Sequence, residues 1–151
     1  MYKKVLVPLD GSGLAECALR HIISLAAEGS LGEVTLLNIV KFDLPWLDDD
    51  AKAINLDEIR APLFAASGKY LAKIEARLRS KGIAVKKETI EANHLADTII
   101  EYARKKKMDL IVLSTHGYSG FKRLMLGSVA FGVMSGSDVP VLLIRPAACR
   151  K

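Results

Sequence analysis

The sequence contains few cysteines, few aromatic residues and no long apolar run. Its two cysteines, Cys17 and Cys149, show no C-x-x-C spacing, which argues against a disulfide framework and a zinc site. We predict two free thiols, as in a reducing compartment. No stretch approaches the roughly 18 apolar residues that span a bilayer, and the N-terminal apolar run is too short for a signal peptide. The expected location is the cytoplasm, with no membrane partner.

Charge and composition describe an ordinary globular chain. Half of the 151 residues are hydrophobic, and the length predicts one domain over residues 1–151. The 22 basic and 17 acidic residues give a net charge of +5, which suits either a nucleic acid or a small anionic ligand. The longest basic run, residues 104–107, is typical of the last turn of a helix and has no interleaved aromatic residues. We therefore expect no nucleic-acid partner.

Strand and helix patterns alternate along the chain. Apolar runs predict strands, and apolar residues at a spacing of three and four predict helices. Ser12 is a candidate cap for the first helix. The predicted strands are residues 3–9, 33–40, 83–91, 109–114 and 140–145; the predicted helices are residues 14–26, 57–80, 94–107 and a short one from about 127, with an acidic loop over 41–55. The alternation indicates an α/β fold, a doubly wound parallel sheet with helices on both faces.

The helix over 57–80 is predicted to turn one apolar face toward the core. The residues expected on this face are Leu63, Phe64, Leu71, Ile74 and Leu78. Gly82 is expected to end the helix, as Gly29 ends the first one.

Ligands of such sheets bind beyond the carboxyl ends of the strands. The first strand ends in Pro8, Leu9 and Asp10, and the fourth is followed by small and polar residues over 114–120. Glu16 occupies the third glycine position of a dinucleotide fingerprint, which argues against NAD as the ligand. The Walker and nucleophile-elbow patterns also fail for lack of the required residues.

A glycine-lined turn that leads into a helix remains as a candidate site. The first turn of a helix carries unpaired N–H groups and a positive dipole, so it attracts anions. Gly117 and Gly127 would allow close approach of a ligand, and Ser128 adds a hydroxyl group. The alternative is that Gly127 and Ser128 only end the loop and cap the helix. The spacing alone does not choose between these two interpretations.

The stretch from Ser114 to Ser128 resembles the ATP-binding branch of the universal stress protein family. In that branch a glycine, two residues, a glycine, nine residues and a glycine with serine or threonine follow one another. Gly117, the nine residues after it and Gly127-Ser128 match, whereas Ser114 replaces the first glycine. The segments 5–12, 98–103, 109–112 and 140–145 are also similar. The resemblance covers essentially the whole chain and implies strand order 3-2-1-4-5, a homodimer through the last strand, and bound ATP accompanied by Mg²⁺.

The resemblance also implies roles for individual residues. Pro8 and Asp10 would flank the adenine and ribose, Ile39 and Val40 would line the adenine pocket, and Gly117, Gly127 and Ser128 would meet the phosphates. Alternatively, Asp10 only caps the first helix and His116 is a structural loop residue. The full set of candidate site residues is Pro8, Leu9, Asp10, Ile39, Val40, Ser114, His116, Gly117, Gly120, Gly127, Ser128 and Val129.

Three functions are compatible with these residues. The leading interpretation is an ATP-binding regulatory protein, because no general base is evidently placed for attack by water. The second is a slow ATPase or phosphotransfer enzyme that uses His116, Asp10 and a metal carried by the nucleotide. The third is a nucleotide-free dimerisation module, which the serine at position 114 would permit.

Overall fold

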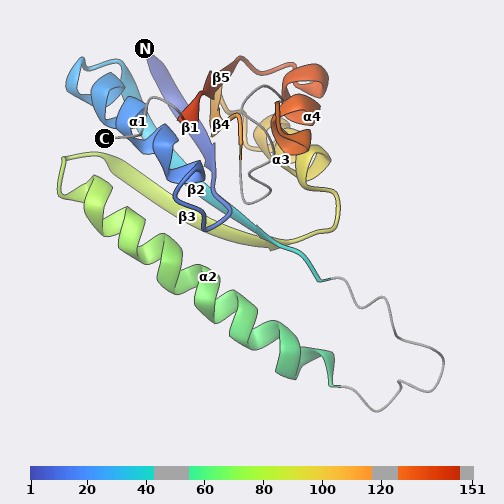
Figure 1. Ribbon diagram of the computed structural model, residues 1–151. Coiled ribbons are helices and arrows are strands. Elements are labelled where there is room, and N and C mark those ends of the chain that lie inside the picture. Colours follow the sequence, from blue (N-terminus) through green and yellow to red (C-terminus); the bar gives the residue numbers. More distant parts are fainter. Residues whose placement is uncertain (43–54, 117–125, 147–151) are drawn as a thin grey trace.

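The computed structural model describes residues 1–42, 55–116 and 126–146 (Figure 1). Five strands form one parallel sheet with the order β3-β2-β1-β4-β5, which confirms the expected fold class and strand order. The strands are β1 (Tyr2–Pro8), β2 (Leu31–Val40), β3 (Ala84–Glu91), β4 (Leu110–Ser114) and β5 (Val141–Ile144). The helices are α1 (Ala18–Ala27), α2 (Leu56–Arg79), α3 (Leu95–Lys105) and α4 (Ser128–Gly136), with a short 3-10 helix, η1, at Ala15–Cys17.

The sheet carries a hydrophobic core on each face. Side chains alternate along β1, so Val5 and Val7 belong to the cluster under α1 and α2, whereas Leu6 belongs to the cluster under α3 and α4. All three are fully buried. Figure 1 shows the two helix pairs on opposite sides of the sheet. Apolar residues at consecutive strand positions are thus explained by a sheet that is covered twice.

The first helix begins later than its apolar pattern predicts. Ser12 Oγ accepts a hydrogen bond from Ala15 N at 3.1 Å, but the residues at the N-cap positions of η1 and α1 are Leu14 and Cys17, and neither makes a side-chain capping bond. The next residues form the 3-10 turn η1, and α-helical geometry starts only at Ala18. The tighter turn arises because Ser12 binds both Asp10 and Ala15 and so fixes the chain next to the strand end.

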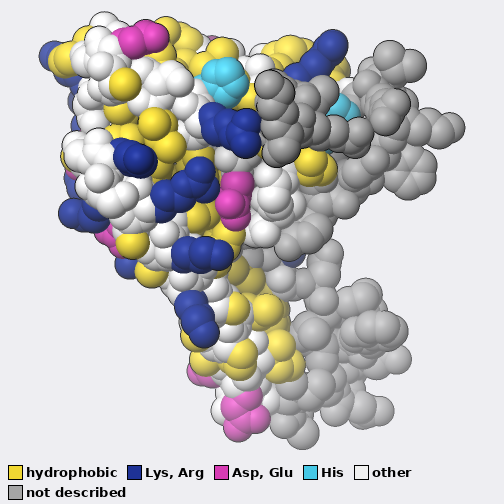
Figure 2. All heavy atoms as spheres, turned by 60° about the vertical axis from the view of Figure 1, so that its left-hand side comes forward, with side chains coloured by type: hydrophobic (Ala, Val, Ile, Leu, Met, Phe, Trp, Pro, Cys, Tyr) yellow, Lys and Arg dark blue, Asp and Glu magenta, His cyan; other side chains and the backbone are white. Residues whose placement is uncertain are grey.

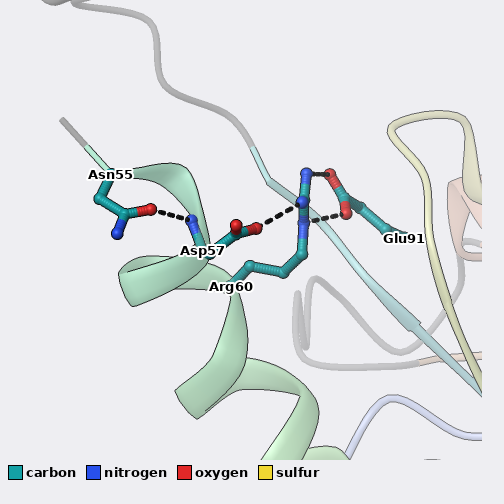
Figure 3. A network of polar contacts seen from close by, with 4 residues as sticks. All are labelled: Asn55, Asp57, Arg60 and Glu91. Atoms are coloured by element: carbon teal, nitrogen blue, oxygen red, sulfur yellow. Dashed lines mark hydrogen bonds and ion pairs between the residues drawn. The ribbon is translucent and has the colours of Figure 1, made fainter. Parts of the chain in front are cut away.

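Helix α2 is attached to the sheet by polar contacts at its first turns (Figure 3). Asn55 caps the helix through Asp57 N at 3.2 Å. Arg60 forms ion pairs with Glu91 at 2.6 Å and with Asp57 at 3.2 Å, and its guanidinium lies 5.8 Å from the ring centroid of Phe42. The carboxylate of Glu91 raises the pKa of Arg60 above its usual value. These contacts connect the beginning of α2 with the ends of β2 and β3.

The apolar pattern of α2 overstates how much of the helix is buried. Leu71, Ile74 and Leu78 are buried as expected, but Leu63 is 39% exposed and Phe64 is only half-buried. The first turns of α2 project away from the other helices (Figure 1). Hydrophobic side chains gather on this part of the surface (Figure 2), where Leu56 and Ile59 are also exposed. The prediction of Leu63 as an inward residue was therefore wrong.

Helices α3 and α4 pack closely because α4 carries glycine where they touch. A Cβ added at Gly132 would lie 2.7 Å from Ala96 Cβ, and one at Gly136 would lie 2.9 Å from Ile100 Cδ1. Real Cβ atoms do not approach this closely, so the helices could not keep their spacing with larger residues. The close pair fixes the start of α4 over the carboxyl end of β4.

The amino end of the sheet holds a polar cavity of about 360 Å³ whose side chains bind one another. Lys86 pairs with Glu33 at 3.1 Å, and the Tyr102 hydroxyl donates to Glu88. Beside it, Asp109 Oδ2 accepts hydrogen bonds from the backbone N–H groups of Lys3 and Lys4, both at 2.8 Å. Strands β1 and β4 are thereby joined at their beginnings.

The cysteines and the basic run differ in how well they were predicted. Cys17 is disulfide-bonded, so the prediction of a free thiol was wrong; Cys149 lies outside the described residues. Sequence spacing does not reveal which residues a fold brings within the roughly 6 Å between Cα atoms that a disulfide needs.

Arg104 and Lys105 of the basic run occupy the last turn of α3, as predicted. None of the helices in the described ranges is long and apolar enough to cross a bilayer.

Candidate functional site

A cavity of about 340 Å³ lies beyond the carboxyl ends of β1 and β4. The strand order reverses between these two strands, because the chain continues from β1 toward β2 and later returns to β4. Open α/β sheets bind their ligands at such a switch point. The volume falls within the range of about 300–1,000 Å³ that is usual for small-molecule sites.

Hydrogen bonds hold the chain that leaves β1 at the edge of the cavity. Leu9 N donates to Leu37 O at 2.8 Å, and Asn38 Nδ2 donates to Leu9 O at 2.7 Å, so β2 fixes this segment. Asp10 Oδ1 then accepts from Ser12 N at 2.9 Å and from Ser12 Oγ at 2.6 Å. Gly11 makes the turn with φ of +87°, a left-handed conformation that glycine adopts without strain. The Asp10 carboxylate is consequently oriented at the cavity wall.

The end of β4 supplies a second polar segment. Ser114 and Thr115 are buried, and Thr115 N donates to Ile144 O at 2.9 Å. Thr115 Oγ1 lies 2.8 Å from His116 Nδ1, and His116 N donates to Ser114 Oγ at 3.3 Å. His116 Nε2 is buried without a hydrogen-bond partner among the described residues. A buried polar atom in this state is uncommon, which makes this nitrogen a candidate contact for a ligand.

The start of α4 closes the cavity. Gly127 N donates to Thr115 O at 2.8 Å, and Phe131 N donates to Gly127 O at 2.8 Å. A Cβ at position 127 would lie 2.9 Å from Thr115 O. Glycine is thus required here by the close approach of two backbone segments, since its φ of −61° is accessible to any residue. The N-terminus of α4, with Ser128 beside it, directs its positive dipole toward the cavity.

Apolar side chains form the other walls of the cavity. Ile39 lies at the end of β2, Leu95 and Ile99 lie at the start of α3, and Leu37 and Leu113 belong to the sheet. The cavity therefore combines apolar walls with a carboxylate at one strand end and a helix N-terminus at the next. This arrangement suits a ligand with a flat apolar part, hydroxyl groups and an anionic part.

The structure brings most of the candidate residues together. Nine of them line the cavity: Pro8, Leu9, Asp10, Ile39, Ser114, His116, Gly127, Ser128 and Val129. Val40 is absent from the described lining, because it follows Ile39 in the strand and so points to the opposite face of the sheet. Gly117 and Gly120 lie outside the described residues, as does the acidic part of the loop predicted over 41–55.

Sequence reasoning missed several residues of the cavity wall. The apolar pattern places Leu95 and Ile99 only on a helix face, and Thr115 is one member of a polar run. They line the cavity because the N-terminus of α3 reaches the switch point from one face of the sheet. Their sequence pattern is that of ordinary core residues, so only the strand order could have identified them.

These features define a doubly wound α/β protein with a small-molecule site at the switch point. The family model described as the universal stress protein family matches residues 1–145. Universal stress protein MJ0531 of Methanocaldococcus jannaschii is 33% identical over 145 residues, covering 96% of this chain and 83% of the relative. Universal stress protein YxiE of Bacillus subtilis is 33% identical over 151 residues, which cover 96% of this chain and 100% of the relative. The chain belongs to the universal stress protein family.

Solved structures have the same fold. The structure of MJ0577 from Methanocaldococcus jannaschii has a TM-score of 0.82 at 28% identity and covers 100% of this chain and 98% of its own. A universal stress protein in complex with cAMP has a TM-score of 0.64 at 21% identity, and the match covers 96% of this chain and 98% of that protein. The Arabidopsis thaliana protein At3g01520 with AMP bound has a TM-score of 0.68 at 14% identity, and the match covers 95% of this chain and 91% of that protein. At these last two identities the likeness shows the fold alone.

Proposed function

We propose that this protein binds ATP in the cavity between β1 and β4 and acts as a cytoplasmic, single-domain regulatory protein. The observation that carries the proposal is the cavity itself, which has apolar walls, the Asp10 carboxylate and the N-terminus of α4 around one space of about 340 Å³. The cAMP and AMP complexes of proteins with this fold support an adenine nucleotide as the ligand class.

Each part of the nucleotide has a proposed partner. Adenine lies between the apolar walls near Ile39, and the ribose hydroxyls donate to Asp10. The phosphates accept hydrogen bonds from the first N–H groups of α4 and from Ser128. The tight contact between Gly127 and Thr115 leaves no side chain in front of those N–H groups.

Mg²⁺ arrives with the triphosphate in this proposal. The described part of the chain contains no group of three or more His, Cys, Asp or Glu side chains that could hold a metal ion. When bound, the ion would neutralise part of the phosphate charge. The protein's contribution is the orientation of the nucleotide by α4 and Asp10.

A negatively charged side chain at position 128 tests the proposed phosphate site without disrupting the fold. An acidic residue at the start of a helix is favourable for the helix, so Ser128→Glu should leave the thermal midpoint within about 2 °C. The same carboxylate would repel the phosphates, and we expect at least a roughly tenfold loss of ATP affinity in titration calorimetry. Ser24→Glu places the same charge on α1, away from the cavity, and is the matched control. Equal affinities of both variants and the wild type would refute this phosphate site.

A slow phosphotransfer activity is the second candidate, because His116 Nε2 has no partner among the described residues beside the cavity. Incubation with ATP labelled in its terminal phosphate separates the two candidates. A regulator releases no labelled phosphate above the background of a protein-free sample. Release that His116→Gln and Asp10→Ala both abolish would support the enzyme instead.

We also propose that a homodimer forms through β5. Val141 and Leu143 pack against the core under α3 and α4, whereas Leu142 is 36% exposed. Phe131 and Met134 of α4 are also exposed, and an apolar edge strand with free backbone groups favours pairing with a second copy. These side chains add apolar area beside that edge.

Light scattering tests the dimer. A mass near twice the 16.4 kDa of the chain is expected, and Leu142→Asp should reduce it to that of the monomer. Leu63→Asp changes a similarly exposed leucine on α2 and should remain dimeric. A monomeric wild type, or a dimeric Leu142→Asp, would place this proposal in error.

A further inference from the structure

Thr115, the residue that follows β4, is held in place by its backbone on two sides. Its N–H group donates to Ile144 O of β5 at 2.9 Å, and its carbonyl oxygen accepts from Gly127 N at the start of α4 at 2.8 Å. The residue is 9% exposed and lines the cavity. Because the backbone makes these two bonds, the side-chain hydroxyl is not needed to keep Thr115 between β5 and α4.

The hydroxyl of Thr115 instead binds the imidazole of the next residue. Thr115 Oγ1 lies 2.8 Å from His116 Nδ1, and His116 N donates to Ser114 Oγ at 3.3 Å, so the ring and the backbone of His116 are both held. His116 also lines the cavity, and its second ring nitrogen, Nε2, is shielded from solvent without a partner among the described residues. With Nδ1 engaged by Thr115, Nε2 is the ring nitrogen left for a ligand.

The position of the ring proton decides what Nε2 can bind. A neutral imidazole has one N–H group and one acceptor nitrogen, and a hydrogen bond at one nitrogen selects the role of the other. If Nδ1 carried the proton, the hydrogen of the buried Thr115 hydroxyl would have no acceptor among the described residues. If Nδ1 accepts that hydrogen, only the N–H group at Nε2 remains to be paired. The second arrangement leaves fewer buried polar groups without a partner, so it is the favoured one.

The start of α4 adds further donors to the wall of the same cavity. The first N–H groups of α4 have no partner within the helix, and Ser128 contributes a hydroxyl group. An N–H group at His116 Nε2 extends this set of donors without adding a charge. Phosphate oxygens only accept hydrogen bonds, so they match such a set, whereas a lone pair at Nε2 would repel them.

We propose that Thr115 is a positioning residue that keeps the proton of His116 on Nε2, so that this N–H group donates to a phosphate oxygen of the nucleotide. The inference rests on the proposed ATP site and adds a determinant of its specificity for phosphate. His116 touches the ligand, and Thr115 acts through it. A protonated Nε2 has no lone pair with which to attack phosphorus or accept a proton, so this arrangement favours binding over phosphotransfer.

Nitrogen NMR of the labelled protein tests the ring proton without any nucleotide. At about pH 8, His116 should show a protonated Nε2 and an unprotonated Nδ1. Thr115→Val removes the hydroxyl from a side chain of nearly the same shape, and the ring should then become a mixture of both forms, as free imidazole is in water. Thr115→Ser keeps the hydroxyl and should keep the wild-type signals. The exposed His21 and His94 serve as internal references, and loss of a signal in His116→Gln assigns His116.

Titration calorimetry with ATP and with adenosine, which lacks the phosphates, tests the consequence for binding. Thr115→Val should weaken ATP binding by about three- to tenfold, the usual effect of one hydrogen bond, and adenosine binding much less. Thr115→Ser should bind both ligands as the wild type does. Thr35→Val is the matched control, because Thr35 is a buried threonine of β2, 4% exposed, that lines the cavity at the amino end of the sheet. It should leave both affinities unchanged.

A second background shows whether Thr115 acts through His116. The amide of glutamine in His116→Gln supplies an N–H donor that has no tautomer. On this background, Thr115→Val should cause no further loss of ATP affinity. An equal loss on both backgrounds would mean that Thr115 contacts the ligand itself, which would refute the positioning role.

The outcomes separate this inference from the proposed function. A proton on His116 Nδ1 in the wild type, or His116 signals that Thr115→Val leaves unchanged, refutes the inference while the ATP site remains. The same loss of ATP affinity in Thr35→Val would also refute it, because the effect would then follow from general loosening. A wild type that binds neither ATP nor adenosine overturns the proposed function, and the inference with it.

Discussion

The two ends of the sheet carry cavities of similar volume but opposite character. The cavity at the amino end, about 360 Å³, is lined by charged side chains that pair with one another, such as Lys86 with Glu33 and Lys87 with Glu75 at 2.8 Å. The cavity at the carboxyl end, about 340 Å³, has apolar walls, a helix N-terminus and a histidine nitrogen without a partner among the described residues. The volume of a cavity therefore does not identify a binding site. Polar groups that have no partner within the protein are the better indication of one.

The largest expected effect is at Gly127, where one substitution should damage both fold and site. A side chain there meets Thr115 O at 2.9 Å, so Gly127→Val should lower the free energy of unfolding by about 1–3 kcal/mol and abolish measurable ATP binding. Urea unfolding and calorimetry measure the two effects.

Gly68 is the contrasting glycine. It lies within α2, and a Cβ added there would meet no atom of the described residues within 4 Å beyond its own stretch of helix. Gly68→Ala should therefore stabilise the protein by about 0.5–1 kcal/mol in urea unfolding. A destabilising Gly68→Ala together with a harmless Gly127→Val would contradict the packing described for both helices.

The next expected effect distinguishes the amino end of the sheet from its carboxyl end. Asp109→Ala removes the acceptor for Lys3 N and Lys4 N at the amino end and should cost about 1–2 kcal/mol of stability in urea unfolding. ATP affinity should not change. Glu28→Ala, which removes an exposed carboxylate at the end of α1, should have no measurable effect on either quantity. A roughly tenfold change of ATP affinity in Asp109→Ala would show that the two ends are coupled.

Alkaline pH should act on both ends through their tyrosines. Burial raises the pKa of Tyr70 and of Tyr102 above the ordinary tyrosine value, so both stay neutral in the folded protein when an unfolded chain ionises. Their contribution to stability is complete below about pH 10 and declines as pH rises above it. Tyrosinate absorbance of the folded protein should show two groups that titrate above the ordinary tyrosine value, and Tyr70→Phe with Tyr102→Phe should flatten the decline of stability. Simultaneous titration of every tyrosine near the ordinary value would contradict their burial.

The smallest expected effect concerns the serine that departs from the family's glycine pattern. Ser114 is 8% exposed and lines the cavity, and among the described residues its Oγ makes a long contact of 3.3 Å with His116 N. Ser114→Gly should increase ATP affinity by a factor of about two to five, less than a methylene group is worth in a close-packed pocket. Weaker binding in calorimetry would mean that the hydroxyl contributes to the site.

The fold was predictable from the sequence because each strand and helix is marked by its own period and end signals. Gly29 and Gly82, with φ of +66° and +77°, follow α1 and α2 as their sequence positions suggested. The strand order came from the family resemblance, and the structure confirms it. The exposure of Leu63 was not predictable, because its spacing is the same as that of a core residue and only its tertiary surroundings distinguish the two.

The candidate site was predictable where small and polar residues follow a strand. Asp10, Ser114 and Gly127 meet at one cavity for that reason. The contributions of Leu95 and Thr115 were not predictable, since they depend on which elements the topology places behind those loops. The disulfide at Cys17 belongs to the same group, because it depends on a long-range approach that spacing does not encode.

The central position of β1 determines when the site can form as the chain is made. β1 precedes the other described strands along the chain, yet one of its two neighbours is β4, and the bond from Lys3 N to Asp109 spans 106 residues. A growing chain can pair β1 with β2 long before β4 has emerged, and contacts so distant in sequence form slowly. The cavity, which needs both strand ends and α4, is therefore completed only after the start of α4 has been synthesised. A ligand of this cavity would stabilise the finished fold, but it could not guide the early steps of folding.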